Sequence, residues 1–437
     1  MKKLFFSGHS EDNLNIADAV DNDASELIFN VAHTAGTKLF EKIVKNDKLL
    51  KKDEIKDQIF SSGVPIDEVV FLPLERLISD EEKRVVSDTF NLVLDTGRFT
   101  TGPYVEKFEN ELKTFLNLKH VVTCCSGTDA LIVSLLAVGV KVGDEIILPA
   151  NSFAATENAI LAIGGVPVYA DIDPVTYNID PDDIKNKITG KTRAILPVNL
   201  YGKVSNTKDI SRLIENTDLL IVEDACQSIG GTGTAKYSDV AVFSFNPFKN
   251  FSVCGKAGAI GTNDSELFEK IKRFSYHGFD PSKKNVKDFD FGYNSKMDNT
   301  HAAVALARLP FLGLNNFKRL FLASRYSAAM GHLEILKVPE ICADHAWHLY
   351  TVELLSGKRD DFRAKLKNKY SIETDIYYPV LSHKHGTNLV KTKYQQIILP
   401  ITELTHSRML SLPLHQNLSI QEQDMVIDAI LNECKKL

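Results

Sequence analysis

From about residue 71, short apolar runs alternate with segments in which apolar residues recur every three or four positions. The short runs are bounded by Gly, Pro, Asn or Asp and predict strands, whereas the longer spacing predicts helices. Strands are expected at residues 120–125, 145–149, 166–172, 194–198, 219–223, 240–245 and 257–261, and helices at 79–94, 104–117, 128–138, 154–163, 208–215 and 265–276. This alternation predicts an α/β fold with a mostly parallel sheet covered by helices on both faces.

The pattern differs at the two ends of the chain. Residues 1–70 are rich in Lys, Asp and Asn and have weak helical periodicity, which predicts an N-terminal extension with one or two helices. Residues 71–314 carry the alternating pattern and are expected to form a large domain. Residues 315–437 are expected to form a smaller α+β domain, with strands at 347–354 and 372–377 and helices at 360–369 and 420–433.

Composition limits the classes of partner. The chain has 437 residues, 44% of them hydrophobic, and a formal net charge of -6. Nucleic acid and anionic membranes need a clustered basic surface, so the charge argues against both. The apolar run near the N-terminus is too short for a signal peptide, and no stretch is long enough to span a membrane. We therefore expect a cytoplasmic protein.

The six cysteines show no metal-ligand spacing and no Cys-x-x-Cys pair. We expect them to be reduced and mostly buried, and we expect no metal site.

One lysine stands between two of the predicted strands. Lys249 lies in a turn of small and polar residues after strand 240–245 and before strand 257–261. Partial desolvation on such a loop lowers the pKa of an amine toward nucleophilic use. Most lysines are solvated surface charges, so Lys249 becomes a candidate only in the company of other residues.

Three further features follow predicted strands, at the edge where a parallel sheet forms its ligand crevice. Gly127 and Thr128 open a helix, where free backbone N–H groups can bind phosphate, although the same residues suit an ordinary helix start. Phe153 can stack on a flat ring or serve as a core residue. Asp224 ends an apolar strand, where a carboxylate needs a cationic or hydrogen-bonding partner. Together with Lys249, this set matches the needs of pyridoxal 5'-phosphate.

From about residue 71 onward, the chain resembles the fold-type I sugar aminotransferases of the DegT/DnrJ/EryC1/StrS family, which depend on pyridoxal phosphate. The motifs that carry the resemblance are GRFTTGPYVEKFE, SGTDAL, PANSFAATENAIL, VEDACQSIGG, FSFNPFKN and GYNSKMDNTHAA. The resemblance implies a seven-stranded large domain. It also implies that Lys249 binds the cofactor as a Schiff base, that Asp224 pairs with its ring nitrogen and that Phe153 stacks on its ring.

Further roles are implied by the same resemblance. Gln227 lies near the ring hydroxyl, and the phosphate is held by Gly127, Thr128 and Ser244. Asn294 reaches the cofactor phosphate from the second subunit of a homodimer with shared active sites.

The resemblance also implies the reaction. Glutamate is the expected amino donor, pyridoxamine 5'-phosphate the intermediate form of the cofactor, and a keto-sugar the acceptor. The segments YHGF, NSKMDN and NNFKRLFLA are similar to family members that aminate C3 of 3-oxo-glucose 6-phosphate to kanosamine 6-phosphate in antibiotic biosynthesis. Two features depart from the family: the leading segment, and Lys296 where arginine is usual. The candidates for binding a sugar phosphate, each of which also suits an ordinary surface charge, are Arg98, His277, Lys296, Lys318 and Arg319.

Other functions stay open at this point. A nucleotide-linked keto-sugar is the alternative substrate within the same fold. A dehydratase is disfavoured, because family dehydratases carry histidine where this chain has Lys249. A non-enzymatic regulator would use residues 1–70 to bind DNA, although acidic residues interrupt the basic ones there.

Overall fold

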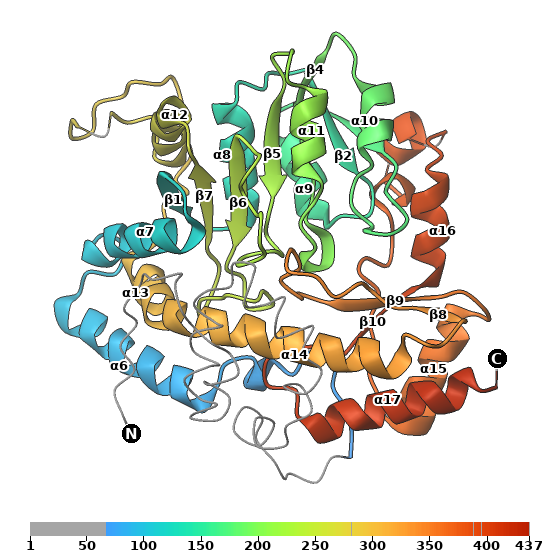
Figure 1. Cartoon of the computed structure of the whole chain (residues 1–437). Coiled ribbons are helices and arrows are strands. Elements are labelled where there is room, and N and C mark those ends of the chain that lie inside the picture. Colours follow the sequence, from blue (N-terminus) through green and yellow to red (C-terminus); the bar gives the residue numbers. More distant parts are fainter. Residues whose placement is uncertain (1–66, 281, 388, 395, 437) are drawn as a thin grey trace, which may run out of the picture.

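The structure is a computed structural model that describes residues 67–280, 282–387, 389–394 and 396–436 (Figure 1). The predicted N-terminal extension therefore lies almost entirely outside the described residues. The first described element is the short 3-10 helix η1 (Leu74–Arg76).

A seven-stranded sheet forms the centre of the molecule, with the strand order β1-β7-β6-β5-β4-β2-β3. Only β7 is antiparallel to its neighbours β1 and β6, while the other neighbouring strands run parallel. The strands are β1 (His120–Cys124), β2 (Glu145–Pro149), β3 (Val166–Ala170), β4 (Thr192–Ile195), β5 (Leu220–Asp224), β6 (Val240–Ser244) and β7 (Gly258–Thr262). The predicted α/β fold with a mostly parallel seven-stranded sheet is confirmed.

Helices cover both faces of this sheet because successive side chains of a strand point to opposite faces. In β2, Ile146 and Leu148 belong to one core and Ile147 to another. The first face carries α8 (Gly127–Ala137), α9 (Ala154–Ala162) and α12 (Ser265–Ser275). The second carries α7 (Pro103–Leu116), α10 (Pro181–Lys187), α11 (Thr207–Leu213) and α13 (Asn299–Arg308).

Helix α6 (Asp80–Thr96) packs against α13 at the lower left of Figure 1. Ser79 caps it: the Ser79 hydroxyl accepts from the Glu82 amide, and the Glu82 carboxylate accepts from the Ser79 amide. The N-cap predicted at Ser79 is confirmed.

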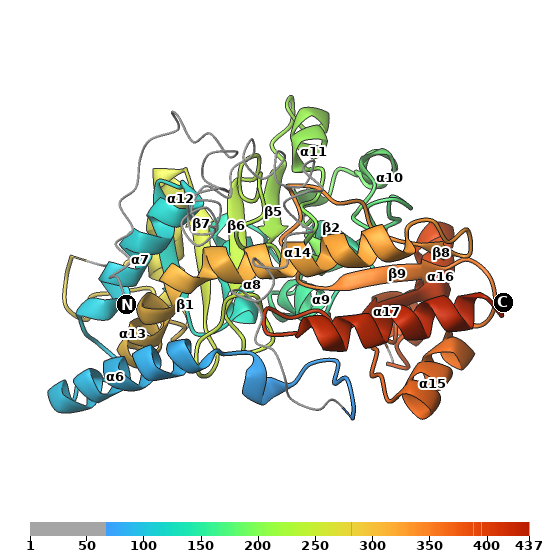
Figure 2. The ribbon, with the colours of Figure 1, turned by 60° about the horizontal axis from the view of Figure 1, so that its bottom comes forward.

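A second, antiparallel sheet has the order β10-β9-β8, with β8 (Leu336–Lys337), β9 (Tyr350–Leu354) and β10 (Met409–Leu412). It packs with α15 (Arg359–Tyr370) and α17 (Ile420–Cys434), and α17 runs beside the long helix α14 (Leu312–Met330) in Figure 2. Further elements are α16 (Pro400–Arg408), the 3-10 helices η2 (Leu200–Gly202), η3 (Leu309–Phe311) and η4 (Ser382–Lys384), and the π-helix η5 (Val390–Tyr394).

Helix α14 joins the two parts of the chain. Leu312 packs in the core of α7 and α13, whereas Phe317 packs in the core of the second sheet. The domain boundary predicted at residue 314 stays a prediction, because one continuous helix crosses that position.

Two expectations need correction. Residues 372–377 form no strand: Ile372 and Asp375 make isolated bridges to Val69 and Ser411. All six cysteines are free, but Cys254 is exposed, and only Cys124 and Cys434 are buried.

Candidate active site

Lys249 lies on the loop between β6 and β7, beyond the carboxyl end of β6. The loop begins with a turn in which the Lys249 amide donates to the Asn246 carbonyl at 2.9 Å. The Lys249 side chain is half-buried. Burial lowers the pKa of its amine, against the opposing effect of Cys226 and Asp224. More of the neutral, nucleophilic amine is therefore present at a given pH than for an exposed lysine.

Asp224 is the last residue of β5, and its side chain is buried. Its carboxylate accepts a hydrogen bond from Thr156 Oγ1 at 2.9 Å and one from the Cys226 amide at 3.2 Å. Both donors are neutral, and within the described part of the chain Asp224 forms no ion pair with a protein cation. A buried carboxylate in this state provides a place for a cationic ligand atom, such as a protonated ring nitrogen.

The start of α8 lies against the end of β6. Ser126 caps the helix by accepting from the Asp129 amide at 3.0 Å. A Cβ atom on Gly127 would lie 2.8 Å from Ser244 Cβ and 3.2 Å from Cys226 Sγ. Only glycine allows this approach, which brings the N–H groups at the helix start next to the Ser244 hydroxyl. The positive end of a helix beside a hydroxyl suits a phosphate.

Phe153 and Gln227 complete this group. Phe153 precedes α9 and is 54% exposed, so part of its ring is accessible to a ligand. The Gln227 side chain accepts through Oε1 from the Tyr201 backbone amide at 2.8 Å and donates through Nε2 to the Tyr378 hydroxyl at 3.3 Å. The ring centroids of Phe153 and Tyr378 are 5.4 Å apart.

Four predicted residues, Arg98, His277, Asn294 and Lys296, make no direct side-chain bond to this group in the described chain. The segment that carries Asn294 and Lys296 does run beside the strand end before α8, because Lys296 pairs with Cys124 and the Cys125 amide donates to the Ser295 carbonyl at 2.8 Å. Asn294 and Arg98 are exposed. The Lys296 ammonium lies 4.8 Å from the centroid of the Tyr276 ring, and the His277 and Tyr276 rings are 5.1 Å apart. Among the described residues, no hydrogen bond or ion pair connects these side chains to Lys249 or Asp224.

Arg319 is a structural residue, contrary to its candidacy for phosphate binding. Its side chain is 2% exposed and donates to the carbonyls of Trp347, His348 and Leu414 and to Gln416 Oε1. Burial lowers the pKa of Arg319 to about 9. Lys318 is half-buried, and burial lowers the pKa of its amine, which lies near Glu82 and Glu81.

Sequence reasoning missed three contributors. Thr156 lies in a motif that was recognised, but its hydrogen bond to Asp224 was not foreseen. Tyr378 comes from the second part of the chain, and no local pattern pointed to it. His348 lies near Lys249 and shares a 3.1 Å hydrogen bond with Asn250, and burial holds its pKa well below the ordinary value. The predicted strand that includes His348 gave no sign of this contact.

The residues around Lys249 suit pyridoxal 5'-phosphate in charge and shape. They provide an amine of lowered pKa, a buried carboxylate without a cationic partner in the described chain, an exposed aromatic face and a helix start at a glycine that leaves room. The fold and this site define the class of pyridoxal-phosphate-dependent aminotransferases.

The chain belongs to the DegT/DnrJ/EryC1/StrS aminotransferase family, whose sequence profile matches residues 78–431. It is 44% identical over 440 residues to a 3-oxo-glucose-6-phosphate:glutamate aminotransferase from Bacillus subtilis (strain 168), covering 100% of this chain and 99% of that protein. It is 35% identical to a pleiotropic regulatory protein from Geobacillus stearothermophilus, over 77% of this chain and 91% of that protein.

A crystal structure of NtdA from Bacillus subtilis with bound cofactor PMP has a similar fold. The TM-score is 0.88 and the identity 44%, and the match covers 92% of this chain and 99% of that one. The family resemblance seen in the sequence is confirmed. In the described residues, no helix combines the length and the apolar character that crossing a membrane would require.

Proposed function

We propose that this protein is a pyridoxal-phosphate-dependent aminotransferase that moves the amino group of glutamate to C3 of 3-oxo-glucose 6-phosphate. The products are 2-oxoglutarate and kanosamine 6-phosphate. The observation that supports the substrate is the 44% identity over the whole chain to an aminotransferase of that name. The observation that supports the chemistry is the group formed by Lys249, Asp224, Gly127 and Phe153.

When bound, pyridoxal phosphate supplies a carbonyl group that can take up and release an amino group, and a ring that stabilises negative charge. Lys249 would hold the cofactor covalently at rest. Once an amino substrate has replaced it, the freed Lys249 amine would take the proton from the α-carbon of glutamate and would pass it to the cofactor carbon that bears the nitrogen, so that the lysine is neutral again. Its lowered pKa suits this role, because a base must be neutral to accept a proton.

Asp224 keeps a proton on the ring nitrogen. Thr156 fixes the carboxylate by donating to Oδ2, and the Cys226 amide fixes Oδ1. Gly127, Thr128 and Ser244 bind the phosphate, Gln227 binds near the ring hydroxyl, and Phe153 covers the ring.

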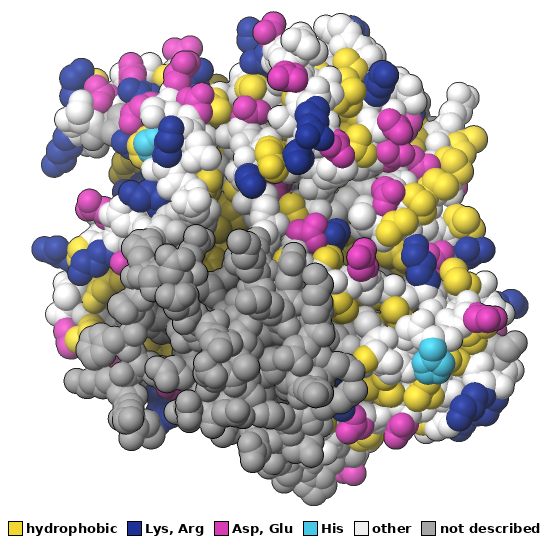
Figure 3. Space-filling view, viewed as in Figure 1, with side chains coloured by type: hydrophobic (Ala, Val, Ile, Leu, Met, Phe, Trp, Pro, Cys, Tyr) yellow, Lys and Arg dark blue, Asp and Glu magenta, His cyan; other side chains and the backbone are white. Residues whose placement is uncertain are grey.

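We also propose a cytoplasmic homodimer in which each subunit completes the site of the other. Asn294 and Arg98 are exposed, and in the described part of the chain neither side chain forms a hydrogen bond or ion pair with Lys249 or Asp224, which suits residues that serve a partner. Asn294 would bind the cofactor phosphate, and Arg98, His277 and Lys296 are the candidates for binding the sugar phosphate. Basic and acidic side chains are interspersed on the described part of the face in Figure 3, which gives no support to a DNA-binding surface there.

The substrate is tested by comparing kcat/KM for 3-oxo-glucose 6-phosphate with kcat/KM for a UDP- or dTDP-linked keto-sugar, with glutamate as the donor. We expect a preference for the sugar phosphate by at least about a hundredfold, the ratio that a lost charge-assisted contact produces. Turnover of the nucleotide-linked sugar alone would refute the proposed substrate.

A further inference from the structure

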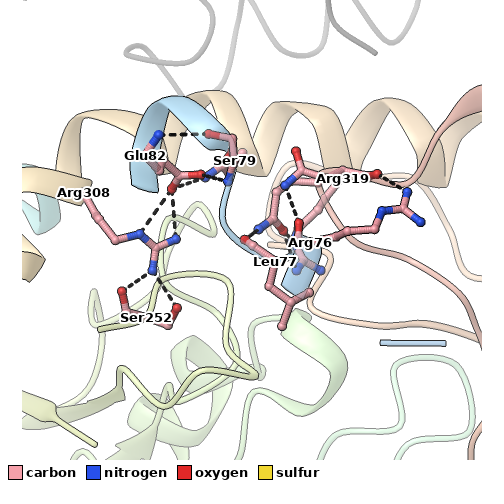
Figure 4. A network of polar contacts seen from close by, with 10 residues as sticks. Arg76, Leu77, Ser79, Glu82, Ser252, Arg308 and Arg319 are labelled. Carbon is pink, nitrogen blue, oxygen red and sulfur yellow. Dashed lines mark hydrogen bonds and ion pairs between the residues drawn. The ribbon is translucent and has the colours of Figure 1, made fainter. Parts of the chain in front are cut away.

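The loop that carries Lys249 is anchored by a buried arginine from a different element. Arg308, the last residue of α13, donates through Nη1 to the Ser252 hydroxyl at 2.7 Å and also to the Ser252 carbonyl. Figure 4 shows the guanidinium between the loop and α6. Ser252 follows Lys249 by only three positions, so its place constrains the backbone of the lysine.

Arg308 is itself held by a carboxylate. Glu82 Oε1 accepts from Arg308 Nη2 at 2.9 Å and from Nε at 3.2 Å. The two side chains are 2% and 1% exposed. Glu82 is fixed in turn because its other oxygen accepts from the Ser79 amide at 2.9 Å. A buried guanidinium whose donors are directed in this way has one well-defined position.

The rest of the loop is held by neutral contacts. Asn250 donates to the Ala346 carbonyl at 2.6 Å and to Asn316 at 3.1 Å. Phe251 is buried against Phe108 and Phe245. In the described part of the chain, Arg308 is the charged side chain that binds the backbone of this loop. The backbone directly after Lys249 is therefore fixed by the contacts of Asn250, Phe251 and Ser252.

We propose that Arg308, oriented by Glu82, is a positioning residue for the reaction: it fixes the Ser252 backbone and thereby the place from which Lys249 acts. This inference rests on the proposed function, since it concerns the same lysine. Arg308 touches neither the substrate nor the cofactor in this account. A displacement of about 1 Å in a reacting group can lower a rate by about a hundredfold, so such an anchor has a measurable effect.

A general contribution to stability is the competing explanation, and the chain offers a matched control. Arg76 forms a bidentate ion pair with Glu422, at 2.6 and 2.7 Å, which ties η1 to α17. Figure 4 shows Arg76 beside Leu77 and Arg319, on the opposite side of the view from Arg308, and no hydrogen bond or ion pair in the described chain joins Arg76 to the Lys249 loop. R76Q therefore removes another bidentate arginine–glutamate pair, in which Arg76 is 40% and Glu422 4% exposed, and leaves the loop anchored.

The test compares wild type, R308Q, R308K and R76Q at a temperature well below all their Tm values. Measured are kcat and KM for glutamate, together with hydrogen exchange of the amides in residues 246–257 of the cofactor-free protein. We expect R308Q to lower kcat by about tenfold or more, to change KM by less than about twofold and to speed exchange in the loop. R308K keeps the positive charge but loses the forked guanidinium, so its kcat and its loop exchange should lie between those of the wild type and R308Q. R76Q should lower Tm and leave kcat and the loop exchange unchanged.

The proposal is overturned if R308Q has the same kcat and the same loop exchange as the wild type and loses Tm as R76Q does. If R308Q does not fold, R308K decides by the same criteria. Failure of the proposed function has a separate signature: the wild-type protein would show no turnover with glutamate, although its loop exchange would still depend on Arg308.

Discussion

At Lys249, burial and neighbouring charge act on the same amine in opposite directions. Burial lowers the pKa, while Cys226 and Asp224 raise it, and burial has the larger effect. The result is an amine that is neutral at lower pH than an exposed lysine and yet lies in the field of a carboxylate. Both properties serve a residue that must bind a carbonyl carbon and later accept a proton.

The first prediction concerns this pKa. Cofactor-free protein should bind pyridoxal phosphate at Lys249 with a rate that rises with pH and reaches its midpoint below 10.5, the ordinary value for lysine. The sign follows because only the neutral amine attacks, and a lowered pKa makes it available at lower pH. The measurement is the rate of appearance of the lysine-bound cofactor absorbance as a function of pH. Lys249→Ala is the control and should show none.

A second prediction concerns the glycine at the start of α8. In Gly127→Ala the new methyl group would lie 2.8 Å from Ser244 Cβ, so the helix start must move away from the phosphate position. We expect the affinity for pyridoxal phosphate to fall by about tenfold, or about 1.4 kcal/mol. Equilibrium dialysis of the cofactor measures this. Gly190→Ala, where no atom lies within 4 Å of the added carbon, should bind as the wild type does.

At the scale of elements, hydrophobic periodicity predicted the helices and strands whose formation depends on local sequence. The strand predicted at 145–149 has those bounds in the structure, as β2. The short elements α10, α16 and β10 were missed, since seven- and nine-residue helices and a four-residue strand give little periodic signal. In residues 372–377 the side chains of Ile372 and Ile376 pack in the core of the second sheet, but the backbone forms only isolated bridges, at Ile372 and Asp375, and no strand.

In the candidate site, too, some residues could be predicted from the sequence and others could not. Lys249, Asp224 and Gly127 follow strands, and parallel strands bring their carboxyl ends to one edge, so their proximity could be predicted. The roles of Tyr378 and Arg308 could not be predicted, because their hydrogen bonds join segments far apart in sequence. Tyr378 accepts from Gln227, and Arg308 donates to Glu82. In the sequence Arg319 suited a free cation, and only the fold shows that its guanidinium donates to backbone carbonyls.

A third prediction concerns the cap of α17. The Ser419 hydroxyl accepts from the Glu422 amide at 3.2 Å, and Glu422 accepts from the Ser419 amide at 2.8 Å. Ser419→Ala removes one of these bonds and should lower the free energy of unfolding by about 1 kcal/mol. Urea denaturation measures the loss. Ser356→Ala, at an exposed bend, should change it by less than about 0.5 kcal/mol, and an equal effect of both substitutions would speak against the cap.

At the scale of the whole molecule, the exposed positions of Asn294 and Arg98 lead to a fourth prediction. If each subunit completes the site of the other, Lys249→Ala and Asn294→Ala are each inactive in their own homodimers. A mixed dimer then contains one site with both wild-type residues. An equal mixture after subunit exchange should recover about a quarter of the wild-type activity, because half of the dimers are mixed and each has one working site of two.

Activity no higher than the sum of the two parent proteins, with subunit exchange verified by mass spectrometry, would show that Asn294 serves its own chain. The shared site would then be wrong, although the role of Lys249 would be unaffected.

The central claim is that Lys249 carries a cofactor that alternates between an amino donor and a keto-sugar phosphate. Its most direct measurement is the absorbance spectrum of the cofactor-loaded protein during sequential additions. Glutamate should remove the absorbance of the lysine-bound cofactor and release one equivalent of 2-oxoglutarate per site, and 3-oxo-glucose 6-phosphate should then restore it. A spectrum that neither addition changes, in protein loaded with cofactor at Lys249, would contradict the account.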